Sequence, residues 1–317
     1  MIPFMKLKWI SLLGSLAGIC ITLFLTFEVK NGFRKGIDFA GGVNLEVALN
    51  DVVTIDRLKE IFQKNSITGT ILKAGTEESE MAKIEIDGEF QSELEKRASG
   101  IAVDLDKAGY AVNAIDYLRY IVKKEIITGK ENIEKVVFLG ADHVGPTVGK
   151  YLTNSAIKLL LITLVLITLY TSFRFKVEFA MGAMLALLHD LLFTVGFIGV
   201  LQIPLSIPVV AALLTILGYS INDTIVIFDR IRENMKGNDS ISVEALVDKS
   251  INESLARTTI TSLATMISIL GVFFMAEDTL KDMALVLILG IIIGTYSSSF
   301  IASPIVVLWE KWKHRAV

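Results

Sequence analysis

A carboxylate lies within a stretch of sequence that is otherwise apolar enough to cross a membrane. Asp223 follows Asn222 inside the run that begins near Val209, and the next charged residue is Asp229. A carboxylate in a membrane span is costly, so it normally faces a protein interior, a partner charge or water, and it is a candidate functional residue. We therefore expect Asp223 to take part in what the protein does.

Arg257 lies where a later apolar run begins, and it is the candidate partner of Asp223. A helical rise of about 1.5 Å per residue puts Asp223 roughly 9 Å from Asp229 at the membrane edge, within reach of an arginine that enters there. Two interpretations stay open. The pair could be a structural ion pair, or the carboxylate could load and release a proton as the cation moves away. We favour the second, because a structural contact does not need a run as polar as residues 220–224.

His189 and Asp190 form a second ionisable pair, near the middle of an earlier apolar run. Histidine titrates in the range that suits proton transfer. Neighbours in sequence point to different sides of a helix, so we expect at most one of the two to face Asp223. The candidate proton- or ion-coupling residues are therefore Asp190, Asn222, Asp223 and Arg257, and the role of His189 stays open.

Hydroxyl groups are concentrated in the last apolar run. They belong to Thr295, Ser297, Ser298 and Ser299, with Tyr296 among them. These residues could line a proton route, but small residues are equally expected where membrane helices pack closely. Close packing is the interpretation that we prefer for this cluster.

The sequence has no motif of a soluble enzyme. It contains no phosphate-binding glycine loop, no nucleophile elbow and no zinc helix motif. Its three histidines lie in segments that the topology keeps apart, so no metal site is expected. The single cysteine, Cys20, excludes an intrachain disulfide. We expect no enzymatic activity and no cofactor. If the protein uses energy, we expect it to come from an ion gradient across the membrane.

Membrane helices must position these residues. The 317 residues are 52% hydrophobic with a mean hydropathy of +0.58, too apolar for a soluble protein of this size. A net charge of −3 without a polybasic run gives nucleic-acid binding no support. Six apolar runs have the roughly 20 residues that span a bilayer. They are approximately Trp9–Phe27, Leu152–Ser172, Val177–Leu201, Ile207–Phe228, Thr259–Ala276 and Met283–Leu308.

Residues 28–151 have the character of a soluble domain. Apolar periodicity predicts interleaved strands and helices, which indicate one small α+β domain of the split βαβ type. The predicted strands are Asn44–Leu49, Met81–Asp87 and Val136–Leu139, and the predicted helices are Thr54–Asn65, Glu89–Lys107 and Asn113–Ile126.

The short loops give an orientation. Lysine and arginine gather in alternate loops, which the positive-inside rule places in the cytoplasm. We expect residues 1–27 to form a cytoplasmic N-terminus and an uncleaved first span, 28–151 an extracytoplasmic domain, 152–308 five further spans and 309–317 a cytoplasmic tail. Segment 238–256 is amphipathic, so we expect it to lie along the cytoplasmic membrane surface, as a connecting helix or as a coupling helix.

Five short motifs follow one another along the chain. They are Gly36-Ile37-Asp38-Phe39-Ala40-Gly41-Gly42, Val144-Gly145-Pro146-Thr147-Val148-Gly149, His189-Asp190, Gly218–Arg230 and Arg257-Thr258. This set resembles the SecD/SecF family of bacterial protein-export subunits, within the RND superfamily of proton-driven transporters, and the resemblance covers essentially the whole chain.

The resemblance implies roles for these motifs. Asp223 would be the acid of proton passage and Arg257 the arginine that interacts with it. The membrane part would be one six-helix half of an RND-type unit, and the outer domain would be ferredoxin-like. A hinge would join the two. Its glycines suit a turn, because glycine adopts backbone angles that other residues rarely adopt. These hinge and motif residues are Gly36, Asp38, Phe39, Gly41, Gly42, Gly145 and Pro146.

The resemblance also implies partners. The chain would be an accessory subunit of the Sec translocase in the bacterial inner membrane, paired with SecD in a pseudo-symmetric twelve-helix unit. The proton or sodium motive force would drive late-stage export of a translocating preprotein. Further partners implied are the SecYEG channel, YajC and the lipid bilayer.

Two other functions stay open. Half of an RND-type exporter for lipids or small hydrophobic molecules is the main alternative, although one small outer domain is a poor chamber for a substrate path. A membrane anchor that presents a binding domain is the other, but an anchor does not need Asp223 inside a span.

Overall fold

Six long apolar helices and one small sheet divide between two units of the chain. The computed structural model describes residues 2–50, 53–76, 79–128, 136–236, 241–276 and 278–315. Contacts assign Lys35–Ser155 to the unit with the sheet, and Met1–Arg34 with Ala156–Val317 to the helical unit.

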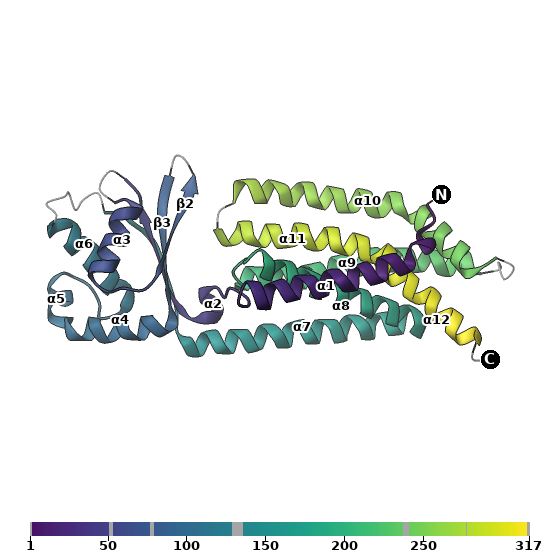
Figure 1. Ribbon diagram of the computed structural model, residues 1–317, viewed down its shortest axis with the longest axis horizontal. Coiled ribbons are helices and arrows are strands. Elements are labelled where there is room, and N and C mark those ends of the chain that lie inside the picture. Colours follow the sequence, from purple (N-terminus) through teal and green to yellow (C-terminus); the bar gives the residue numbers. More distant parts are fainter. Residues whose placement is uncertain are drawn as a thin grey trace. The chain divides into compact units, whose positions relative to one another are not determined.

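The smaller unit is a four-stranded antiparallel sheet covered on one face by helices (Figure 1). The strand order is β2-β3-β1-β4, in which each crossover skips a strand, as in the split βαβ arrangement. In chain order the elements are β1 (Gly42–Ala48), α3 (Ile55–Lys64), β2 (Thr70–Thr76), β3 (Ser79–Asp87), α4 (Gly88–Gly100), α5 (Ala102–Lys107), α6 (Ala114–Thr128) and β4 (Phe138–Val144). The predicted α+β domain is confirmed.

Local sequence explains these elements. Val43, Leu45 and Val47 alternate along β1 and are fully buried in the core between sheet and helices. The Thr54 hydroxyl caps α3 by accepting from the N–H of Arg57 at 3.2 Å, and the Asp87 carboxylate caps α4 in the same way. Two predictions were wrong in detail. The helix predicted over 89–107 is two helices, and strand β2 was not predicted.

The helical unit contains the six membrane spans that the sequence predicts. Within the described residues, six helical stretches are long and apolar enough to cross a bilayer. They are formed by α1 (Lys8–Phe24) with a π-helical turn at Leu25–Val29, α7 (Pro146–Arg174), α8 (Val177–Val200), α9 (Ile207–Met235), α10 (Val243–Met275), and α11 (Asp278–Ser297) with η4 (Ser298–Ala302) and α12 (Ser303–Arg315). About half of the most apolar stretch is buried in α8, in α9 and in the sixth span, against 11% in α7 and α10, so these three spans lie at the centre of the unit.

Helix α10 joins two elements that the sequence separates. The amphipathic segment predicted over 238–256 and the span predicted over 259–276 form one helix, Val243–Met275, and residues 238–240 lie outside the described residues. Ser242 caps its start by accepting from the N–H of Ala245 at 3.4 Å, and the helix contains no proline. The amphipathic segment is therefore a continuous extension of the span and not a separate helix.

The chain's N-terminal residues are held by this extension. Backbone N–H groups of Ile2 and Met5 donate to the side chains of Asn252 and Asp248, each at 2.8 Å. Glu244, one helical turn before Asp248, forms ion pairs with Lys8 at 3.0 Å and with Lys311 of α12. Residues 244, 248 and 252 thus form one stripe on α10 that binds the start of the chain.

The sixth span is interrupted by a π-helical segment, η4, whose cause is Pro304. Proline has no N–H, so the carbonyl of Phe300 loses its normal helical donor. That carbonyl accepts instead from Ser11 Oγ of α1 at 3.0 Å. The extra residue in the turn changes the direction of the side chains around Ser297.

Candidate functional site

Asp223 is buried in α9 and weakly held. The side chain is 1% exposed, and Ser262 Oγ of α10 donates to its Oδ2 at 3.3 Å. Ser262 also bonds Thr295 Oγ1 of α11 at 2.8 Å. Thr224, the next residue, points its hydroxyl back to the carbonyl of Ser220. Asp223 therefore faces hydroxyl groups contributed by two neighbouring helices.

Arg257 lies on the same side of α10 as a polar cavity and not in a direct ion pair with Asp223. Among the residues that the structure describes, no salt bridge joins the two side chains. Arg257 lines a cavity of about 560 Å³ between α9 and α10, together with Asn222 and Ser254. The remaining lining residues are Ile225, Val226, Asp229, Arg230, Glu233 and Glu253. Asn222 and Arg257 thus come together at a polar cavity, one residue away from Asp223.

Asp190 is more firmly bonded than Asp223. It is fully buried in α8, and its Oδ2 accepts from Ser220 Oγ of α9 at 2.5 Å and from Ser297 Oγ of α11 at 2.8 Å. Its Oδ1 lies 2.9 Å from Nδ1 of the adjacent His189. Asp190 points toward α9 and α11, while the ring of His189 lies against Phe193 and Tyr296.

Close helix packing brings these groups together. A Cβ on Gly294 of α11 would lie 3.0 Å from the Cβ of Ser220, so this contact needs glycine to keep the Ser220 hydroxyl on Asp190. Ser220 precedes Asp223 by one helical turn, and Ser297 follows Thr295 by two residues. The polar groups of α8, α9, α10 and α11 therefore form two adjacent clusters, one around each carboxylate.

Most of the hydroxyls that build these clusters were not predicted as site residues. Ser220, Ser262, Thr295 and Ser297 bond a carboxylate or its partner, whereas the hydroxyl of Ser298 bonds the carbonyl of Thr295 in its own helix. The hydroxyls of Thr295 and Ser297 bond across helices that pack closely, and a proton route through this cluster stays a prediction. Their common signal is a hydroxyl in a span that also contains or faces an acid.

Two of the five motifs meet at one end of the sheet unit. Gly41 and Gly42 have φ angles of 74° and 140°, which favour glycine, and Gly42 pairs with Val144, the last residue of β4. Gly145 follows, α7 starts at Pro146, and a Cβ on Gly149 would lie 2.9 Å from the carbonyl oxygen of Phe39. Gly36 precedes the short helix α2 (Ile37–Ala40), with Asp38 in its first turn. Of the predicted hinge and motif residues, Phe39 and Gly41 therefore lie in contact with Gly149, and Gly42 lies between β3 and β4.

Comparison with known proteins identifies the family. The model of the protein export membrane protein SecD/SecF C-terminal region matches residues 123–312, and that of the SecD/SecF GG motif matches residues 29–50. The protein translocase subunit SecF of Thermodesulfovibrio yellowstonii is 34% identical over 313 residues, covering 98% of this chain and 95% of that protein. The protein translocase subunit SecDF of Thermus thermophilus is 34% identical over 88% of this chain, which corresponds to 35% of that longer protein.

Solved structures agree with this match. The crystal structure of SecDF from Thermus thermophilus, a translocon-associated membrane protein, has a TM-score of 0.74 and 31% identity over 97% of this chain. SecDF in a super-membrane-facing form has a TM-score of 0.64 and 30% identity over 98% of this chain. This chain spans 38% and 39% of those two chains, respectively. The six-helix unit, its buried carboxylates and the glycine-rich motif are thus those of a member of the SecD/SecF family of protein export membrane proteins, to which this chain belongs.

Proposed function

We propose that this chain is an accessory subunit of the Sec protein translocase that uses the proton or sodium motive force to drive late-stage export of polypeptides. The observation that carries the proposal is Asp223, a buried carboxylate inside a span with one long hydroxyl bond. Burying an unpaired charge is costly, so such a group is retained where its charge has to change. The relatives, which are named as protein translocase subunits, support the export role.

The proposed coupling acts between Asp223 and Arg257. When Asp223 is ionised, it attracts the guanidinium that lines the neighbouring cavity, and when it is protonated, that attraction is lost. Arg257 and Ser262 belong to one continuous helix, α10. A change in the charge of Asp223 therefore changes the forces on two residues of that helix. Each proton that moves down 100 mV supplies about 2.3 kcal/mol, enough for a few protons to shift a two-state equilibrium. Asn222 and Asp190 complete the proposed set of coupling residues.

The proposed partner is a SecD-type subunit. The matching SecDF protein carries, in one chain, a region equivalent to this one and a longer remainder. A fused relative supports the pairing of separate subunits in a twelve-helix unit. The SecYEG channel, YajC and the emerging preprotein are further proposed partners, and no chemical reaction is part of this function.

The proposed location is the bacterial inner membrane, with both termini in the cytoplasm and the sheet domain outside. The distribution of lysine and arginine among the short loops supports this orientation. The packed glycines Gly41, Gly42 and Gly149 are the proposed hinge through which helix movement reaches the outer domain.

The test uses inside-out vesicles that contain this chain, its SecD-type partner and the export channel. Gradient-dependent late-stage translocation of a secretory protein is measured for the wild type, for Asp223→Asn and for Arg257→Met. Asp104→Asn is the matched control, because Asp104 is exposed on α5 of the sheet unit. We expect the first two variants to assemble and lose the gradient-stimulated part while the control keeps it. Wild-type translocation by both variants would contradict the proposal and direct attention to efflux of small hydrophobic molecules.

Proton and sodium coupling are separated in the same vesicles. A proton gradient and a sodium gradient are imposed in turn, and the translocation rate is measured for each. The gradient whose stimulation disappears in Asp223→Asn identifies the coupling ion.

A further inference from the structure

His189 is buried beside Asp190, and its two ring nitrogens have different surroundings. Nδ1 lies 2.9 Å from Asp190 Oδ1, and the residue is 7% exposed. Nε2 is buried and, among the residues that the structure describes, has no hydrogen-bond partner. A buried polar atom without a partner destabilises the folded protein. Such a group calls for an explanation in terms of function.

The bonds to Asp190 determine which ring nitrogen carries the hydrogen. An ionised carboxylate can only accept, and its Oδ2 already accepts from the hydroxyls of Ser220 and Ser297. With Asp190 ionised, Nδ1 of His189 must therefore be the donor to Oδ1. Nε2 is then left with a free lone pair, which is a base directed away from the carboxylate.

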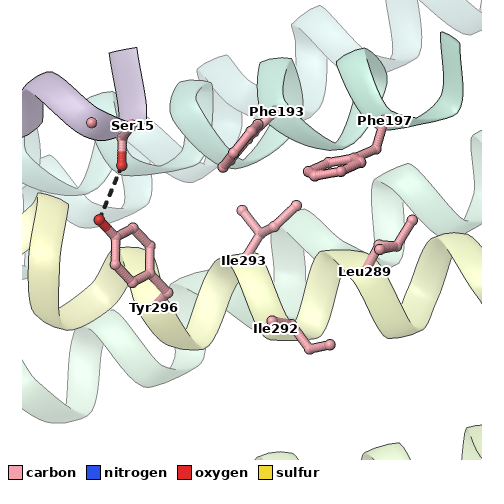
Figure 2. Close-up of a pocket in the computed structure, with 8 residues that line it drawn as sticks. Ser15, Phe193, Phe197, Leu289, Ile292, Ile293 and Tyr296 are labelled. Carbon is pink, nitrogen blue, oxygen red and sulfur yellow. Dashed lines mark hydrogen bonds between the residues drawn. The ribbon is translucent and has the colours of Figure 1, made fainter. Parts of the chain in front are cut away.

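The two aromatic residues that flank this ring also line a groove. The ring centroid of His189 is 5.5 Å from that of Phe193 and 6.3 Å from that of Tyr296. Both of these residues line a groove of about 470 Å³ formed by α1, α8 and α11 (Figure 2). Its walls are mostly apolar, but Ser15 Oγ and the Tyr296 hydroxyl lie 3.1 Å apart at one end. This hydroxyl pair offers a water molecule the polar partners that it needs.

We propose that His189 is the group through which Asp190 exchanges its proton, a role that rests on the proposed coupling function. A proton from water at the hydroxyl end of the groove binds the lone pair of Nε2. The Nδ1–H bond then breaks and its proton joins Oδ1 of Asp190, which leaves a neutral ring with its hydrogen on Nε2. The reverse sequence releases the proton, and no other reactant is needed.

The surroundings of the ring suit this exchange. The titratable groups against it are Asp190, on the same helix, and Tyr296 of α11. The Ser220 hydroxyl of α9 bonds Asp190, and Ser15 of α1 bonds the hydroxyl of Tyr296. The carboxylate is the group that already bonds Nδ1, so it is the acceptor for the proton from Nδ1.

Two substitutions separate proton exchange from positioning. In His189→Asn, the amide nitrogen can replace Nδ1–H as a donor to Asp190 but cannot titrate, whereas His189→Ala removes the donor as well. In the vesicles described above, we expect His189→Asn to assemble normally, to reduce gradient-stimulated translocation about tenfold or more, and to flatten its dependence on pH between about 5 and 8. Wild-type behaviour of His189→Asn would overturn the proposal and leave His189 with a positioning role.

Asp223→Asn, measured in parallel, distinguishes this proposal from the proposed function. If Asp223→Asn retains the gradient response, the coupling function itself fails. If Asp223→Asn loses the response and His189→Asn keeps it, the role of His189 alone fails.

Nitrogen-15 NMR of the full chain in lipid bilayers tests the protonation directly. The chain has three histidines, so the signals of His189 are assigned by their loss in His189→Asn. We expect a protonated Nδ1 and a bare Nε2 in the neutral ring, and a second proton on Nε2 when the sample is acidified. A neutral ring that carries its hydrogen on Nε2, or a ring that gains no proton on acidification, would overturn the proposal.

Discussion

At the scale of single residues, two aspartates in one helical unit are held in different ways. Asp190 faces three donors, one imidazole and two hydroxyls, whereas Asp223 faces one hydroxyl at 3.3 Å. Hydrogen bonds to a carboxylate stabilise its charged form. We therefore expect stability to depend most on Asp190 and ion coupling to depend most on Asp223.

Replacing Asp190 tests the first half of this contrast. Asp190→Leu leaves the buried donors of His189 and Ser220 without this acceptor and limits Ser297 to the carbonyl of Gly294, which should lower the free energy of unfolding by about 3 kcal/mol or more. Asp190→Asn keeps one acceptor oxygen and should cost less. Thermal unfolding in detergent compares both with Asp223→Asn, and equal losses for Asp190→Leu and Asp190→Asn would show that the three donors do not matter.

Two neighbouring serines provide a matched pair. Ser297 donates to Asp190, while Ser298 donates to the carbonyl of Thr295 in its own helix. Ser297→Ala should destabilise the unit by about 1.5–3 kcal/mol because it removes a bond to a charged group, and Ser298→Ala by about 1 kcal/mol or less. Chemical unfolding of both variants measures the difference. Equal effects would contradict the assignment of Ser297 to the Asp190 cluster.

At the scale of elements, the bend in the sixth span links a proline to the polar cluster. Pro304→Ala restores an N–H that can bond the carbonyl of Phe300 and compete with Ser11. We expect this variant to unfold at an equal or higher temperature, yet to lose gradient-stimulated translocation, because a regular helix redirects Ser297. Pro208→Ala is the control, since Pro208 lies in the first turn of α9, where no helical N–H is needed. Loss of activity in both variants would point to a general effect on folding.

The glycine-rich motif makes a prediction for the sheet unit. A Cβ on Gly42 would clash with the carbonyl oxygen of Ile86, and its φ of 140° disfavours other residues. Gly42→Ala should therefore accelerate hydrogen exchange in β1 and β3 of the full chain, in keeping with a loss of about 1–3 kcal/mol. Gly100→Ala, where a Cβ would meet no atom within 4 Å, should leave exchange unchanged or slower. If β1 of Gly42→Ala is protected from hydrogen exchange as well as β1 of the wild type, this account is refuted.

Elements were predictable from sequence where periodicity was strong and boundaries had a chemical cause. The six spans and the strands around Leu45 and Ile84 follow from apolar runs and alternation. Strand β2, with Lys73, Ala74 and Gly75, lacks that alternation, and its place beside β3 depends on tertiary pairing. The bend at Pro304 had a visible signal that was not used.

The candidate site was predictable in its acids and not in their partners. An acid in a span is conspicuous, which is why Asp190 and Asp223 stand out from the sequence alone. Which hydroxyl reaches which acid depends on how each helix is rotated, and the contact between Gly294 and Ser220 sets that rotation for α9 and α11. The position of Arg257 beside a cavity likewise depends on its side-chain conformation.

At the scale of the whole helical unit, the two ends of the chain meet on one helix. Glu244 of α10 pairs with Lys8 near the start of the chain and with Lys311 near its end, and Asp248 accepts from the N–H of Met5. Because α10 also carries Arg257 and Ser262, its movement in a coupling cycle has to carry these contacts along or break them.

Asp248→Ala tests this attachment. Removing the acceptor of the Met5 N–H should loosen residues 2–8 and accelerate their hydrogen exchange about five- to tenfold, as expected for a partly exposed bond worth about 1 kcal/mol. Lys249→Ala is the control, because Lys249 is half exposed and pairs with Glu253 on another side of the helix. Unchanged exchange in Asp248→Ala would show that packing of Phe4 and Met5 and the contacts with Asn252 and Glu244 hold the segment without this bond.

The attachment of the N-terminus to α10 also has a consequence for the order of events during synthesis. Met5 and Asp248 are separated by 243 residues, so the first helix is made long before the surface that receives its leading end exists. At about 5–20 residues per second, a ribosome needs roughly 12–50 s to cover that distance. During this interval the amide of Met5 must be satisfied by water or by lipid headgroups. Completion of the fifth span is therefore the step that lets the start of the chain reach its final place.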